Sequence, residues 1–150
     1  QWHELTEDVV QGEPVCVAAF DLNTITLDEA QGVADAPFAF ALPLERCSAF
    51  AGWFDSDFAG SPSAPASNIV TLDTSPSGGY THWGQQCFFV GPTLVRDAIR
   101  RAGGRAPLAT KGRLSLTRQA GAARLYDVHA TIETEDGGGG ERLALKWELS

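Results

Sequence analysis

The 150-residue chain contains no methionine, and its first residues, Gln1-Trp2-His3-Glu4, have neither the basic start nor the apolar centre of a secretory signal. We therefore expect a piece of a longer protein. No run approaches the roughly 20 apolar residues of a membrane-spanning helix, because charged residues, glycine or proline interrupt every apolar stretch. The sequence thus predicts no membrane partner.

Cysteine and basic residues are scarce. The three cysteines (Cys16, Cys47 and Cys87) form neither a metal-ligand pattern nor a disulfide framework, which favours a reducing compartment, the cytoplasm or the nucleus. Eleven Lys and Arg against nineteen Asp and Glu give a net charge of −8, which disfavours direct binding to nucleic acid. An acidic surface could steer a cationic, Arg-rich partner, or it could simply keep the chain in solution.

Motifs of several common enzyme classes are also missing. There is no Gly-x-Gly-x-x-Gly, no phosphate-binding P-loop, no His-Glu-x-x-His and no Gly-x-Ser-x-Gly. The three histidines, His3, His82 and His129, are scattered along the chain. The sequence therefore predicts no metal site and no cofactor site of its own.

What is present is typical of one mainly-β domain over residues 1–150. Apolar residues make up 43% of the chain, and sixteen glycines and eight prolines fall between short apolar runs. The predicted strands include 37–44, 47–58, 69–74, 85–90, 113–117, 125–132 and 141–149. The strands 113–117 and 125–132 form a predicted hairpin, and the Ser-, Pro- and Ala-rich stretch 60–68 reads as a surface loop. We expect a β-barrel of short antiparallel strands, with a sandwich as the alternative.

One segment has a helical period instead. Between Thr93 and Ala102, apolar residues recur at spacings near 3.6, and Gly103-Gly104 ends the pattern. This predicts a single amphipathic helix inserted between strands. Among the aromatic residues, we expect Trp53, Phe58 and Phe88 to be largely buried.

The segment Tyr80-Thr81-His82-Trp83 is the unusual cluster, and it follows the turn residues 75–79. An imidazole can change its charge near neutral pH, and an indole can form a wall of a cation pocket. This favours an exposed loop with a binding role. The structural alternative is that Tyr80 and Trp83 pack on the barrel rim while His82 is an ordinary loop residue.

Three motifs carry a resemblance to a known family. Residues 71–89, TLDTSPSGGYTHWGQQCFF, resemble the Ser-Thr-Ser-Pro … Thr-His-Trp-Lys-Gln segment of protein arginine methyltransferases. Residues 53–58 resemble the family's Trp-Phe-Asp-x-x-Phe strand, and residues 20–24 its Phe-Asp-Leu-x-Thr entry. The resemblance is clear over 13–89 and weak from 112 onward. Asp73 and Gly84 depart from the family's Ser and Lys, and 93–104 looks like an insertion.

The resemblance implies the C-terminal, substrate-binding β-barrel alone, without the Rossmann-like half and without the dimerisation arm. That missing half would bind S-adenosyl-L-methionine, so this chain would be inactive by itself. The family transfers methyl groups to guanidino nitrogens of protein arginine. Its members act on histone tails and Arg/Gly-rich segments, and a full-length chain would form a homodimer.

The resemblance also assigns roles to four residues. His82 would be catalytic and would bond to an acidic group of the missing half. Trp83 would shape the arginine channel, Thr81 would fix the loop, and Tyr80 would contact the substrate. Thr81 resembles the branch that makes asymmetric dimethylarginine. The alternative function is a non-catalytic, protein-binding barrel or a pseudoenzyme partner.

Overall fold

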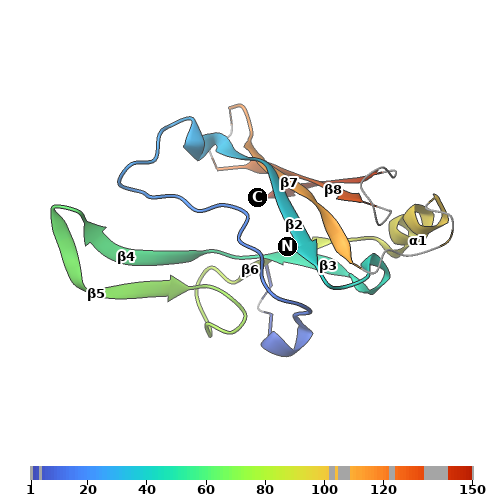
Figure 1. Ribbon diagram of the computed structural model, residues 1–150, viewed down its shortest axis with the longest axis horizontal. Helices are drawn as coiled ribbons and strands as arrows, with labels where there is room; N and C mark the ends of the chain where they lie inside the picture. Colours follow the sequence, from blue (N-terminus) through green and yellow to red (C-terminus); the bar gives the residue numbers. More distant parts are fainter. Residues whose placement is uncertain are drawn as a thin grey trace. The chain divides into compact units, whose positions relative to one another are not determined.

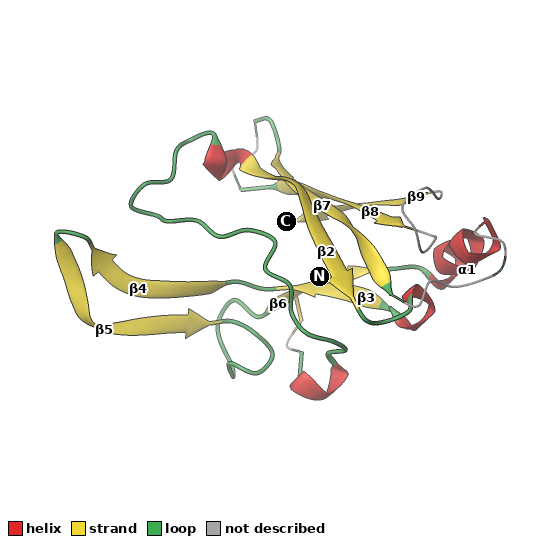
Figure 2. Cartoon of the chain, viewed as in Figure 1, coloured by secondary structure: helices red, strands yellow, loops and turns green. Residues whose placement is uncertain are grey.

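The computed structural model describes residues 2–3, 5–101, 104, 109–121, 124–133 and 142–149. These residues form nine β-strands and one α-helix (Figures 1 and 2). The strands are β1 (Trp2–His3), β2 (Gly32–Phe40), β3 (Ala49–Gly52), β4 (Asp55–Ser61), β5 (Ala64–Asp73), β6 (Gln85–Phe89), β7 (Thr110–Arg118), β8 (Tyr126–Glu133) and β9 (Arg142–Leu149). The α-helix is α1 (Pro92–Arg101), and short 3₁₀ helices lie at Glu7–Val9 (η1), Glu29–Gln31 (η2) and Leu44–Arg46 (η3). The mainly-β prediction with a single helix is confirmed.

The strands of the described residues form three antiparallel sheets, ordered β1-β6-β3, β2-β7-β8-β9 and β4-β5. Contacts divide the chain into two compact units, 1–11 with 49–89 and 12–48 with 90–150. The β2-β7-β8-β9 sheet belongs to the second unit and the other two sheets to the first. Within the described residues the sheets are not joined into one closed ladder. No described helix is long and apolar enough to cross a membrane.

The core of the second unit lies on one face of its sheet. Val128 and Ile132 are fully buried on β8, and Ala130 between them is nearly so, as the period of two in a strand requires. The predicted hairpin is confirmed, because β7 pairs with β8 from Gly112 opposite Ile132 to Arg118 opposite Tyr126. Burial of these β-branched side chains supplies the main apolar stabilisation of the sheet.

The predicted helix is also confirmed. Helix α1 buries Val95 and Ala98, which lie three residues apart on one face, against the segment that carries the buried Leu44 of η3. Just before the helix, the Val90 N–H donates to the Ser48 carbonyl at 2.9 Å. The helix therefore completes the apolar core of the second unit.

The first unit carries the candidate site. Its β1-β6-β3 sheet places Phe50 of β3 opposite Phe88 of β6. Strands β4 and β5, both green in Figure 1, form a long hairpin that ends in a two-residue turn, Pro62-Ser63. Residue Thr74 follows β5 directly, and the chain then forms a loop that returns to the sheet at β6.

The structure corrects several predictions in this unit. The strand predicted over 47–58 is interrupted at Trp53-Phe54 and continues as β4. Segment 60–68 is not a loop, because β4 extends to Ser61 and β5 begins at Ala64. Phe58 is 58% exposed instead of buried, because it and its partner Val70 lie on a side of the hairpin that is open to solvent, and Trp53 and Phe88 are only half-buried.

Candidate functional site

The loop between β5 and β6 is anchored at its first residue by a threonine hydroxyl. Thr74 is 0% exposed, and its Oγ1 donates to the Phe54 carbonyl at 2.6 Å while accepting from the Phe54 N–H at 3.1 Å. Its carbonyl accepts a bond from Nε2 of Gln85 at 2.9 Å. The hydrogen bonds of Thr74 thus connect the start of the loop both to Phe54, where the strand is interrupted, and to Gln85 at the start of β6.

A tight turn follows this anchor. The Ser75 N–H donates to Oδ1 of Asp73 at 2.8 Å, and the Gly78 N–H donates to the Ser75 carbonyl at 3.1 Å. A Cβ at Gly78 would lie 2.6 Å from Cγ of Asp73 and 2.8 Å from its carbonyl oxygen, so the close approach requires glycine. Gly79 next to it has φ +85° and open space around it. The turn therefore has little freedom before Tyr80.

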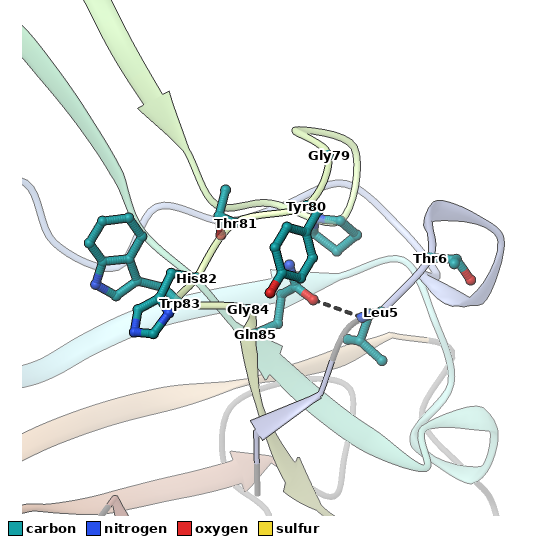
Figure 3. A pocket seen from close by; sticks show the side chains of 10 residues that line it. Leu5, Thr6, Gly79, Tyr80, Thr81, His82, Trp83, Gly84 and Gln85 are labelled. Carbon is teal, nitrogen blue, oxygen red and sulfur yellow. Dashed lines mark hydrogen bonds between the residues drawn. The ribbon is translucent and has the colours of Figure 1, made fainter.

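The second half of the loop lines a hollow of about 510 Å³ (Figure 3). The lining consists of Leu5, Thr6, Pro76 and every residue from Gly79 to Gln85. Gln85 is 3% exposed, and its Oε1 accepts a bond from the Leu5 N–H at 2.8 Å, drawn as the dashed line in Figure 3. A single buried amide therefore joins the N-terminal segment, the loop anchor and β6 around the hollow.

Trp83 is exposed at the hollow and makes edge-to-face contacts with two neighbouring rings. The Trp83 ring lies 5.9 Å from that of Phe54 at 83°, and 6.0 Å from the His82 imidazole at 80°. Tyr80 is 82% exposed, and His82 is exposed on the loop as predicted. An indole or a phenol that is open to solvent offers a face that a cationic, planar group can contact.

Thr81 has a different environment from its neighbours. Its Oγ1 is buried and has no hydrogen-bond partner among the described residues. The bonds that hold this part of the chain come instead from Thr74, Ser75 and Gln85. The roles predicted for Tyr80, Thr81, His82 and Trp83 remain predictions, but all four residues line the same hollow.

Two carboxyl groups face each other at the base of the loop, where Asp55 pairs with Asp73. Desolvation raises the pKa of the Asp55 carboxyl above its ordinary value, and the neighbouring Asp73 carboxylate raises it further. Hydrogen bonds from the side chain and the backbone of Ser75 hold the pKa of Asp73 below its ordinary value. Asp55 is therefore the partner that takes up a proton first as the pH falls.

A second hollow lies in the other unit and has a different character. It measures about 250 Å³ and has an apolar lining that includes Phe20, Val33 and Leu116. The carboxylate of Glu29 also borders it, but that carboxylate already accepts bonds from the N–H and Oγ1 of Thr26, both at 2.8 Å. None of the predicted site residues contributes to it. In the described part of the chain, no group of three or more His, Cys, Asp or Glu could hold a metal ion.

Sequence reasoning missed the supporting residues of the loop hollow. Leu5 and Thr6 carry no local signal, because the contact between Leu5 and Gln85 joins residues 80 positions apart. Gln85 had a usable signal, since it is the first of two glutamines that precede the apolar residues of the strand. A buried glutamine of this kind must find hydrogen-bond partners, and here it finds two.

Comparison with known proteins identifies the class to which this fold and loop belong. Residues 1–134 match the family described as the arginine methyltransferase oligomerization subdomain. The chain therefore belongs to the arginine methyltransferase family and corresponds to the C-terminal domain of its members.

The most similar relatives include one particular member of that family. Protein arginine N-methyltransferase PRMT10 of rice (Oryza sativa subsp. japonica) is 32% identical over 151 residues, which cover 99% of this chain and 37% of the rice protein. PRMT10 of Arabidopsis thaliana is 33% identical over 91 residues, 59% of this chain and 24% of that protein. The chain thus spans little more than a third of the rice relative.

A solved structure shares the fold. The crystal structure of Arabidopsis thaliana protein arginine methyltransferase 10, described as a uniquely open conformation, matches 99% of this chain and 41% of its own, with a TM-score of 0.71 and 22% identity. The family, predicted from three sequence motifs, is confirmed by the family match, and the solved structure shares its mainly-β fold.

Proposed function

We propose that this chain is the substrate-binding part of a protein arginine N-methyltransferase, and that Tyr80, Thr81, His82 and Trp83 form one wall of its arginine pocket. The observation that carries the proposal is that these four consecutive residues line one hollow, on a loop anchored at both ends. Membership of the family supplies the reaction, methyl transfer from S-adenosyl-L-methionine to a guanidino nitrogen.

The chemistry needs positioning more than activation by a strong base. Arginine remains cationic near neutral pH because its pKa lies above about 12, so transfer depends on aiming one nitrogen at the donor methyl group. The exposed rings of Tyr80 and Trp83 offer faces for the guanidinium. A neutral imidazole at His82 can accept a hydrogen bond from a guanidino N–H and help to orient it.

The described residues do not fit the methyl donor. Nucleoside cofactors of this size bind at the carboxyl ends of parallel strands, with a carboxylate on the ribose. The ladders between the described strands are antiparallel, and the loop hollow has no acidic side chain in its lining. We therefore propose that another part of the enzyme holds the donor, and that this chain alone binds none.

The remaining features of the enzyme are proposals from the same resemblance. Thr81 supports the branch that makes asymmetric dimethylarginine. The family description as an oligomerization subdomain supports a homodimer of the full-length enzyme. Histone tails or Arg/Gly-rich proteins are the proposed substrates, and the cytoplasm or the nucleus is the proposed location.

Replacing His82 by alanine in the full-length enzyme tests the catalytic assignment. An orienting or proton-transferring histidine contributes about 10²–10⁴-fold, so kcat and kcat/KM for a peptide should fall together while donor affinity stays the same. Arg124→Ala, an exposed substitution in the other unit, is the control and should leave the kinetics unchanged. Wild-type turnover by a folded His82→Ala enzyme would remove His82 from the active site.

A second measurement separates an enzyme part from a non-catalytic binding domain. Calorimetry of the isolated 150 residues should detect no S-adenosyl-L-methionine binding, and the full-length chain should bind it. If the full-length chain also fails to bind the donor, the chain is a partner domain and not part of an enzyme.

A further inference from the structure

Gln85 is a buried side chain that joins two parts of the candidate site. It lies at the start of β6 and is 3% exposed. The ladder between β1 and β6 consists of two described residue pairs, Trp2 with Gln86 and His3 with Gln85. Just beyond this ladder, the Leu5 N–H donates to Oε1 of Gln85 at 2.8 Å (Figure 3). The Gln85 side chain therefore continues the attachment of the N-terminal segment to β6 as far as the hollow.

The other end of the same amide holds the loop. Nε2 of Gln85 donates to the Thr74 carbonyl at 2.9 Å, 11 positions away along the chain, whereas Leu5 is 80 positions away. Both polar atoms of this buried side chain thus have a partner, as burial requires. One amide therefore connects the N-terminal segment directly to the first residue of the loop.

Trp83 is connected to Gln85 by two routes. Through space, Oγ1 of Thr74 bonds to the backbone of Phe54, whose ring lies 5.9 Å from that of Trp83. Along the chain, a single residue separates Trp83 from Gln85, and this residue is Gly84, with φ +55°. Glycine restricts the backbone less than any other residue does. The position of the indole therefore depends on the hydrogen bonds of Gln85.

We infer that Gln85 is a positioning residue, which holds Trp83 at a fixed place relative to the N-terminal side of the hollow. That side is formed by Leu5 and Thr6, which belong to the same lining as Trp83. The use of the hollow as an arginine pocket rests on the proposed function, whereas the hydrogen-bond network does not. Gln85 acts through the residues that it holds in place.

A residue of this kind affects the rate of transfer more than the binding of the substrate. Methyl transfer requires an aligned guanidino nitrogen, and a displacement of about 1 Å can cost about 10²-fold in rate. The ring faces stay available to a peptide when the loop shifts, so the affinity changes less. Loss of the Gln85 hydrogen bonds should therefore lower kcat and leave KM for the peptide nearly unchanged.

A neighbouring glutamine provides a matched comparison. Gln86 is 8% exposed on the same strand, and successive side chains of a strand point to opposite faces. Oε1 of Gln86 has no hydrogen-bond partner among the described residues. A substitution at Gln86 changes the same buried stretch of β6 without removing the bonds to Leu5 and Thr74. The two positions therefore separate positioning from a general disturbance of the strand.

Gln85→Met and Gln86→Met in the full-length enzyme form the first test. Methionine is an unbranched side chain that makes neither of the two hydrogen bonds. With rates corrected for the folded fraction, Gln85→Met should have a kcat about ten- to hundredfold below the wild type and a KM within about twofold of it. Gln86→Met should have wild-type kinetics. Equal kcat values for the two variants would overturn the inference and leave Gln85 with a structural role only.

Gln85→Glu tests the bond to the loop by itself. The carboxylate still accepts from the Leu5 N–H, but it cannot donate to the Thr74 carbonyl until it takes up a proton. Burial raises the pKa of a glutamate, so the kcat of this variant, divided by that of the wild type at the same pH, should rise from about pH 8 to about pH 5. A constant ratio would overturn the role of this bond. The ratio also decides the question where Gln85→Met is unstable.

A spectroscopic readout keeps the inference separate from the proposed function. Full-length protein labelled with 5-fluorotryptophan gives a ¹⁹F signal for each indole, and the Trp83→Phe variant identifies the signal of Trp83. This signal should shift in Gln85→Met and stay in place in Gln86→Met, with or without methyl transfer. A folded wild type without methyl transfer would contradict the proposed function only. A Trp83 signal that stays in place in Gln85→Met would contradict the positioning role only.

Discussion

Replacing Thr74 by valine should destabilise the loop-bearing unit by about 1–2 kcal/mol. Valine keeps the shape and β-branching of threonine but can neither donate nor accept a hydrogen bond. The Phe54 N–H then loses the Oγ1 acceptor that lies at 3.1 Å, in a part-buried setting where an unsatisfied donor is costly. The Phe54 carbonyl loses the 2.6 Å bond from Oγ1 but keeps a longer one from the Thr74 N–H at 3.3 Å.

The size of this loss of stability depends on which hydrogen bonds Phe54 keeps in the valine variant. The full penalty for a buried, unsatisfied donor is about 1–3 kcal/mol, and partial exposure of Phe54 places the loss in the lower half of that range. For a chain of this length, the change corresponds to a fall in Tm of about 3–6 °C. The side-chain volume changes little, so a cavity contributes little to the effect.

Urea unfolding followed by tryptophan fluorescence provides the assay, in a Trp147→Phe background that removes the indole of the other unit. Thr6→Val, at an exposed position of the same unit whose side chain makes no capping bond, is the matched control and should change stability by less than about 0.5 kcal/mol. If Thr74→Val costs no more than Thr6→Val, the hydroxyl does not anchor the loop. Hydrogen exchange at the Phe54 amide then identifies whether water replaces it.

Three further predictions concern the surroundings of the loop. Asp55→Asn should raise Tm by about 1–3 °C at pH 7. The raised pKa of Asp55 means that the folded state favours the protonated acid, so the wild type loses stability as the pH rises through that pKa, whereas the asparagine variant does not. Thermal scans should show that this gain disappears below about pH 3, and a constant gain would contradict the reasoning. Gly78→Ala should cost about 1–3 kcal/mol through its clash with the Asp73 carbonyl, whereas Gly79→Ala should cost only about 1 kcal/mol of backbone strain. The Cys87 thiol should react with a thiol reagent much more slowly than the exposed Cys16 thiol, because burial raises the pKa of Cys87. Mass spectrometry measures both rates, and equal rates would show that β6 opens readily.

Sequence patterns predicted the second unit better than the first. Strands β7, β8 and β9 alternate buried and exposed residues, and α1 places Val95 and Ala98 on one face. The two-residue period of the strands and the 3.6-residue period of the helix could therefore be recognised in the sequence. In the hairpin β4–β5 the sequence offered a strand signal only at the open end, within the predicted strands 47–58 and 69–74. Eight consecutive residues of β5 are exposed, so no buried face imposes an apolar alternation, and the small residues of 60–68 look like a loop. Backbone hydrogen bonds form this ladder without a core-facing pattern.

The candidate site divides in the same way. Tyr80, Thr81, His82 and Trp83 are consecutive, so a linear motif was enough to place them together. The partners that hold the loop come from distant positions, as with Leu5 at Gln85. The pair of carboxyl groups at the base of the loop depends on register, because only the pairing of Asp55 with Asp73 brings those two side chains together. A shift of one residue would move every side chain of the strand to the other face.

Asp73 connects the geometry of the loop with the charge of the hairpin. By accepting the Ser75 N–H it closes the turn that leads to Tyr80, and hydrogen bonds from the side chain and then the backbone of Ser75 lower the pKa of its carboxyl group. Desolvation raises the pKa of Asp55, and the Asp73 carboxylate across the ladder raises it further, so the turn and the strand pair are linked through the charge of Asp73. A proton taken up by Asp55 lessens the repulsion between the two carboxyl groups and leaves intact the hydrogen bond from Ser75 to Asp73 that closes the turn.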